Sequence, residues 1–67
     1  MKKWTAAEIR LLPAVIDLIT AGEILRIGRT KSYLLVKSGD FPVKVRRVDG
    51  RYKIATADIC RYLEIND

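Results

Sequence analysis

The sequence predicts a small α+β domain in which short helices surround a two-stranded antiparallel hairpin. Three observations lead to this fold class. Thr5, Thr20 and Thr56 each precede a segment with helical features. Residues 43 to 54 alternate between apolar and polar side chains around Asp49-Gly50, which is a strong hairpin signal. The 67 residues, 49% of them hydrophobic, suffice for one small core.

The first expected helix is short. Thr5 and Glu8 have the spacing of a capping box, and Trp4 and Ile9 stand at the positions of a hydrophobic staple. Pro13 disfavours helical geometry at the preceding residue and so ends this helix. The β-branched stretch from 14 to 19 is then expected to be extended.

A second helix is expected from about 21 to 26 or 27. Thr20 and Glu23 repeat the capping-box spacing, and Ile19 and Ile24 form a second staple pair. This helix would turn Ile24 and Leu25 inward, leaving Glu23 toward solvent.

The third helix is expected over 29 to 38, with Gly28 as N-cap and Gly39 as the C-terminal glycine. Helical rotation places Ser32, Leu35 and Val36 on the buried face. The opposite face carries cations, hydroxyl groups and no carboxylate: Arg29, Thr30, Lys31, Tyr33 and Lys37. Leu34 also lies toward this face, either packing against the hairpin or the first helix, or contacting a neighbouring protomer or a thymine methyl group.

In the hairpin, a two-residue turn at Asp49-Gly50 pairs Val48 with Arg51 and continues to Val45 with Ile54. One face would be core, with Arg47 lying over Tyr52. The other face would be almost entirely cationic, with Arg46 opposite Lys53 in a like-charge pair that destabilises an isolated hairpin. An external polyanion would offset this cost, although charge on an exposed strand also protects against aggregation.

The last helix is expected from about 57 to 64, after Thr56. Cys60 fits a small core position there better than a nucleophile. The whole chain, 1 to 67, is expected to be one domain, with the two central helices over about 20 to 39, the hairpin over about 43 to 55 and the closing helix at the end.

Composition argues against several classes of function. The chain has one cysteine and no histidine, which leaves no Cys/His zinc site and no imidazole base. Its carboxylates are scattered singly, so we expect no enzyme, no catalytic residue, no metal and no cofactor. No apolar run reaches the length of a membrane span and no signal peptide is apparent, so we expect a cytoplasmic protein without a membrane partner.

Positive charge is concentrated in the middle of the chain. Residues 26 to 53 hold nine basic and two acidic residues, a net charge of +7, whereas the remainder carries −2. Such a distribution is typical of a polyanion-binding surface.

The element order is therefore a short helix, two helices joined by a tight turn, a basic hairpin and a closing helix, which is the order of a winged helix-turn-helix. Its second central helix would enter the major groove of double-stranded DNA. Arg29 and Thr30 would contact base edges, whereas Lys31, Tyr33 and Lys37 would hold phosphates. The wing would contribute its cations, which are Lys44, Arg46, Arg47, Arg51 and Lys53.

The stretch ITAGEILRIGRTKSYLLVKSGDFPVKVRRVDGRYKIATADICRYL, about residues 18 to 64, resembles small excisionase-type proteins, which are related to the winged domains of mercury-resistance-type regulators. Its most specific parts are IGRTKSY, the SGDFP junction and the hairpin followed by TADI. Two positions depart from the family pattern: Gly22 replaces a usual alanine, and Arg26 replaces a common glycine at the turn.

The resemblance implies a recombination directionality factor of a phage, plasmid or other mobile element. Such a protein binds attachment-site DNA, bends it and directs a recombinase toward excision. The implied partners are double-stranded DNA at attachment or operator sites and further copies of the chain, with an integrase as an additional candidate. Two other functions fit the residues: a small transcription regulator with the same fold, and a basic protein-interaction module.

Overall fold

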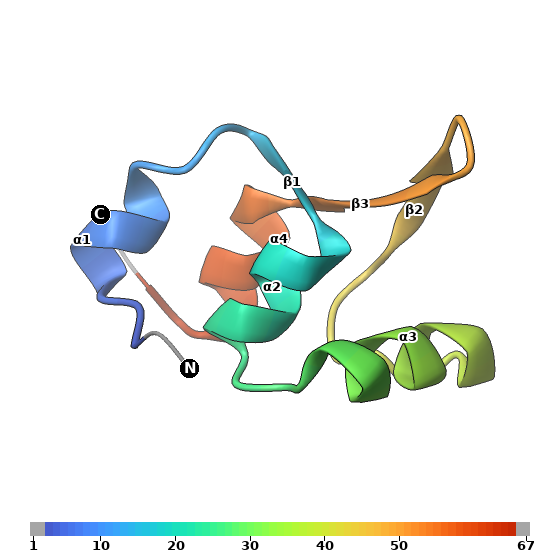
Figure 1. Cartoon of the computed structure of the whole chain (residues 1–67). Helices are drawn as coiled ribbons and strands as arrows, with labels where there is room; N and C mark the ends of the chain where they lie inside the picture. The colour runs from blue at the N-terminus through green and yellow to red at the C-terminus, as the bar shows by residue number, and fades with distance from the viewer. Residues whose placement is uncertain (1–2, 66–67) are drawn as a thin grey trace.

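The computed structural model describes residues 3–65 and shows an α+β domain with four helices and a three-stranded antiparallel sheet (Figure 1). The α+β class is therefore confirmed. The elements, in chain order, are α1 (Ala6–Arg10), β1 (Val15–Asp17), α2 (Leu18–Ile24), α3 (Arg29–Ser38), β2 (Arg46–Val48), β3 (Arg51–Ala55) and α4 (Thr56–Tyr62).

The sheet has three strands where the sequence predicted two. Its order is β1-β3-β2, because the segment expected to be merely extended contributes β1, which pairs with β3 from Val15 opposite Ala55 to Asp17 opposite Lys53. The predicted hairpin register is confirmed for its three pairs between 46 to 48 and 51 to 53. The expected pair of Val45 with Ile54 lies outside the β2 ladder, which begins at Arg46.

The predicted start of the second helix is wrong. Asp17 caps α2, accepting a hydrogen bond from the Thr20 amide at 2.8 Å, so the helix begins at Leu18. Thr20 lies inside the helix, so it forms no capping box with Glu23, whose carboxylate accepts a hydrogen bond from the Trp4 indole N–H at 3.0 Å. The strand β1 ends at Asp17, and a carboxylate there is as good an N-cap as a threonine hydroxyl.

The other helix boundaries are closer to expectation. The Thr5–Glu8 capping box is confirmed, with both of its hydrogen bonds present. The last helix starts one residue early, at Thr56, with Ala55 as N-cap. The Thr56 hydroxyl donates instead to the Pro13 carbonyl oxygen, which ties α4 to the segment before β1.

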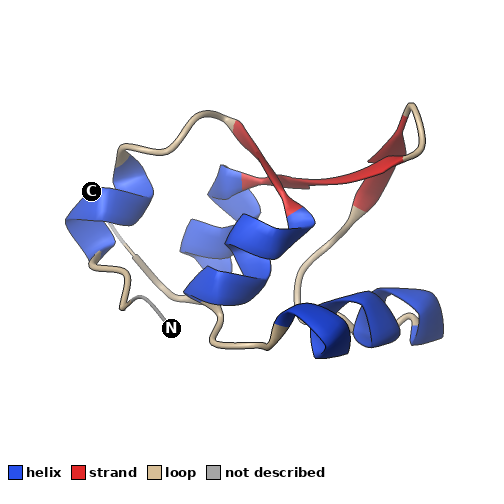
Figure 2. Cartoon of the chain, in the orientation of Figure 1, coloured by secondary structure: helices blue, strands red, loops and turns tan. Residues whose placement is uncertain are grey.

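The core lies between the sheet and the helices α2, α3 and α4, which lie on the same side of the sheet (Figure 2). Its buried apolar residues are Ile9, Ile16, Leu18, Ala21, Ile24, Val43, Ile54 and Ile59. Cys60 is partly buried and packs against this cluster, as its expected structural role requires. Over the described residues, no helix is long and apolar enough to cross a bilayer.

Candidate nucleic-acid interface

The helix α3 has the bounds that the sequence predicts. Gly28 is its N-cap and offers no side-chain acceptor to the amides of the first turn. Gly39 ends the helix in the left-handed conformation, with φ of 81°, and the Asp40 amide donates to the Leu35 carbonyl oxygen at 2.8 Å. The two glycines therefore set the ends of α3, which is ten residues long.

A close approach between α2 and α3 fixes which face of α3 points outward. Ser32 is fully buried, and a Cβ atom built on Gly22 would lie 2.3 Å from its Oγ. Only glycine fits this space. The departure of Gly22 from the alanine expected by resemblance therefore has a physical cause, namely the hydroxyl group of Ser32.

The turn between α2 and α3 is built on Arg26. This residue has φ of 60°, a left-handed conformation that glycine adopts at least cost. The Ile27 amide donates to the Gly22 carbonyl oxygen at 2.7 Å and the Arg26 amide to the Glu23 carbonyl oxygen at 3.2 Å, which is the Schellman pattern. The turn thus keeps its geometry although arginine replaces the expected glycine.

The outward face of α3 is as the sequence predicts. The side chains of Arg29, Thr30, Lys31 and Lys37 are exposed, whereas Leu35 and Val36 are partly buried. Leu34 is 61% exposed and is not among the residues that pack against the core cluster. The face therefore consists of cations, a threonine hydroxyl group and the exposed edge of Tyr33, with one exposed leucine.

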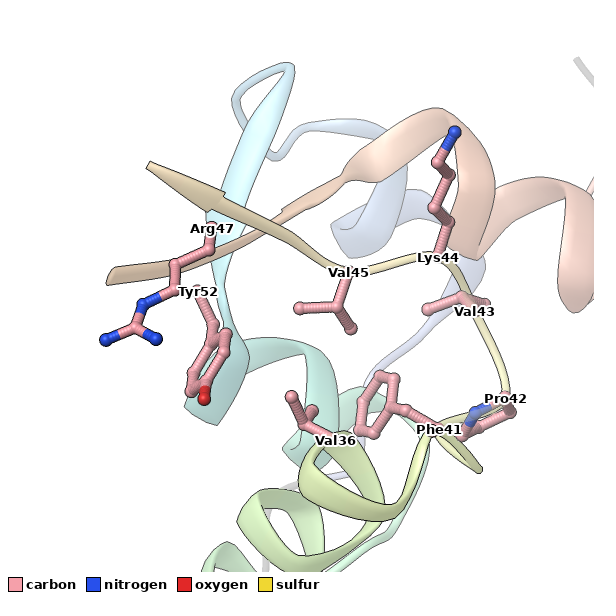
Figure 3. Close-up of a pocket in the computed structure, with 9 residues that line it drawn as sticks. Val36, Phe41, Pro42, Val43, Lys44, Val45, Arg47 and Tyr52 are labelled. Atoms are coloured by element: carbon pink, nitrogen blue, oxygen red, sulfur yellow. The ribbon is translucent and has the colours of Figure 1, made fainter. Parts of the chain in front are cut away.

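Tyr33 connects α3 to the hairpin. Its ring meets that of Tyr52 edge-on, with centroids 6.1 Å apart and an angle of 61° between the planes. The Arg47 guanidinium carbon lies 5.8 Å from the Tyr52 centroid, which confirms the predicted stack (Figure 3). Because Arg47 is directly opposite Tyr52, it lies on the sheet face that is turned toward α3.

The remaining hairpin cations lie elsewhere. Strand alternation puts Arg46, Arg51 and Lys53 on the opposite face of the sheet. Lys44 precedes β2 and lines a shallow hollow with Asp58, Arg61 and Tyr62 near α4. The structure therefore does not bring the five predicted wing cations together on one surface.

The opposite face is also less cationic than predicted. The strand β1, which the sequence did not predict, adds Val15 and Asp17 to this face, and Asp17 is directly opposite Lys53. Hydrogen bonds from the Thr20 side chain and amide, together with the positive charge of Lys53, hold the pKa of Asp17 below its ordinary value. Lys53 thus has a compensating carboxylate that the hairpin sequence alone could not show.

Sequence reasoning placed Tyr52 in the core but missed that it joins the hairpin to α3. The available signal was the predicted pairing of Tyr52 with Arg47 across the hairpin, which puts both side chains on the same face of the sheet. No group of three or more metal-ligating side chains occurs within residues 3–65. Comparison with protein-family models, curated proteins and solved structures found no match for this chain.

Proposed function

We propose that this chain binds double-stranded DNA as a winged helix-turn-helix, with α3 in the major groove and the β2–β3 hairpin beside it. One observation carries the proposal: the exposed face of α3 has no carboxylate, and the tyrosine pair joins it to Arg47 on the hairpin. Lysine and arginine side chains that neutralise phosphates release condensed counterions, which drives binding.

The residues divide by position. Arg29 and Thr30 lie in the first turn of α3, where side chains reach base edges, and arginine matches the two acceptors of guanine. Lys31, Tyr33 and Lys37 lie farther along the exposed face and are suited to phosphates. Arg47, on the hairpin face that is turned toward α3, would contact the adjacent backbone. None of these roles requires chemistry on the DNA.

We further propose that the DNA is an attachment site and that the protein is an excisionase-type directionality factor. The resemblance of IGRTKSY, SGDFP and the hairpin with TADI supports this narrower function. Footprinting on the attachment region of the element, followed by an excision assay with its recombinase, tests it. Protection of a promoter without stimulation of excision would favour a transcription regulator instead.

The roles of α3 and the hairpin predict different effects of two substitutions. Arg29→Ala should cost about 1–3 kcal/mol at a site selected from random duplexes and relax base preference at one position. Arg47→Ala should weaken binding to all duplexes similarly and lower the salt slope by about one. Affinities for the selected and a scrambled duplex, measured by fluorescence anisotropy, give both quantities. An equal loss of specificity in the two variants would contradict the division of roles.

A further inference from the structure

No helix of the described chain lies over the face of the sheet that points away from α2 and α4 (Figure 2). This outer face consists of the residues paired outward across the three strands, which are Val15, Asp17, Arg46, Val48, Arg51, Lys53 and Ala55. It contains a hollow of about 640 Å³. The hollow is lined by Val15, Arg46, Val48, Lys53 and Ala55, so all three strands contribute to it.

Two valines on the outer face expose more than half of their surface to solvent. Val15 on β1 is 53% exposed and Val48 on β2 is 52% exposed, and Ala55 adds its methyl group between them. Valine is a favoured strand residue, but a polar β-branched residue such as threonine would serve the strand equally well in water. The valines therefore offer apolar surface to a ligand.

Cations surround this apolar surface. Arg46 and Arg51 are exposed and form no ion pair within residues 3–65, and Lys53 adds a third positive charge near Arg46. The negative charge of Asp17, opposite Lys53, compensates only one of these three positive charges. The outer face thus combines uncompensated positive charge with exposed valines.

We propose that the outer face binds an acidic protein segment that also carries apolar side chains. Carboxylates of such a segment would pair with Arg46 and Arg51, and its apolar side chains would cover Val15 and Val48. A phosphate backbone would use the cations but leave the valines without partners. Because Arg47 and α3 lie on the other side of the sheet, DNA and this segment would bind at the same time.

A synthetic peptide provides the probe: sixteen residues, helical, with leucines along one side and glutamates along the other. Titration into the ¹⁵N-labelled full chain should shift the amide signals of Val15, Arg46, Val48 and Lys53, and leave those of α3 in place. Matched peptides with lysine for glutamate, or serine for leucine, should bind at least about tenfold more weakly, a difference of about 1.4 kcal/mol.

Two variants test the protein side. Val48→Thr and Arg46→Gln should each weaken binding of the acidic peptide several-fold, with the amide spectrum confirming that each variant is folded. Lys31→Gln on α3 removes one positive charge, as Arg46→Gln does, and is the matched control that should leave peptide affinity unchanged. The absence of shifts at millimolar peptide, or shifts that map to α3, would overturn the proposal.

A second arm separates this proposal from the proposed DNA binding. The titration is repeated with the chain saturated by a 20-base-pair duplex, and the peptide affinity should not change. Displacement of the peptide by the duplex would assign the outer face to nucleic acid and overturn the proposal. Failure of the duplex to bind would count against the proposed function alone, because the peptide site does not depend on DNA.

Discussion

Three helices end on a left-handed residue, and three different residue types occupy that position. Arg26, Gly39 and Glu64 have φ of 60°, 81° and 58°, and in each case the next amide donates to a carbonyl group in the preceding turn, in the Schellman pattern. The same hydrogen bonds therefore form with or without glycine. What differs is the conformational cost, which falls on the residues that carry a Cβ atom.

Arg26→Gly should therefore raise the free energy of unfolding by about 0.5–1 kcal/mol. The relief of left-handed strain, about 1–2 kcal/mol, exceeds the entropy that glycine adds to the unfolded chain. Urea unfolding followed by circular dichroism measures the change. Gly39→Ala is the matched control and should destabilise by about 1 kcal/mol, while a destabilised Arg26→Gly variant would contradict the account of this turn.

Asp17 predicts a specific dependence of stability on pH. Hydrogen bonds from Thr20 and the charge of Lys53 depress its pKa in the folded state. Its contribution is therefore present above the unfolded-state pKa and is lost as the pH falls through the lower folded-state pKa. As the pH falls from about 5 through the folded-state pKa, the free energy of unfolding should fall more steeply for the natural chain than for Asp17→Asn.

Urea unfolding at several pH values provides this comparison. Asparagine also caps helices well, so the Asp17→Asn variant should differ little from the natural chain once the pH is below the folded-state pKa of Asp17, whereas Asp17→Ala should lose about 0.5–2 kcal/mol at neutral pH. If the free energy of unfolding depended on pH in the same way for the natural chain and for Asp17→Asn, the Asp17 carboxylate would not be the source of the pH dependence.

Among the elements, the packing of α2 on α3 depends on one glycine and one serine. Gly22→Ala should destabilise by about 1–2 kcal/mol, because the clash with Ser32 Oγ exceeds the helix-propensity gain of about 1 kcal/mol. Ser32 Oγ is buried and has no hydrogen-bond partner among residues 3–65, so Ser32→Ala should be neutral or stabilising. Gly22→Ala should then cost less in the Ser32→Ala background.

A double-mutant cycle measures this coupling from the unfolding free energies of the four proteins. Additive effects of the two substitutions would contradict the contact. If Gly22→Ala alone raised the free energy of unfolding by the whole helix-propensity gain of about 1 kcal/mol, the added methyl group would not clash with Ser32.

Local signals predicted the elements that depend on neighbouring residues. The glycines flanking α3, the Asp49-Gly50 turn and the Thr5–Glu8 box all act within a few positions, and all were predictable. The start of α2 was not, because Asp17 and Thr20 are both good caps before apolar residues. The pairing of β1 with β3 joins Val15 to Ala55, and no local pattern specifies such a distant partner.

At the scale of the whole molecule, charge is divided between two surfaces. The cations of α3 and Arg47 lie on one side of the sheet, and Arg46, Arg51 and Lys53 lie on the other. Sequence alternation predicted the α3 face and the Arg47–Tyr52 stack. It could not show that β1 adds Val15 and Asp17 to the outer face, which makes a surface expected to be cationic partly apolar and partly compensated.

The salt dependence of binding to a random-sequence duplex tests the central proposal most directly. Anisotropy titrations between about 50 and 200 mM salt should give a logarithm of affinity that falls linearly, with a slope of about −3 to −4 if three or four of the cations of α3 and Arg47 contact phosphates. A variant in which Lys37 and Arg47 are both alanine should have a slope smaller by about two. No binding at the lowest salt, or an affinity independent of salt, would contradict DNA binding by this surface.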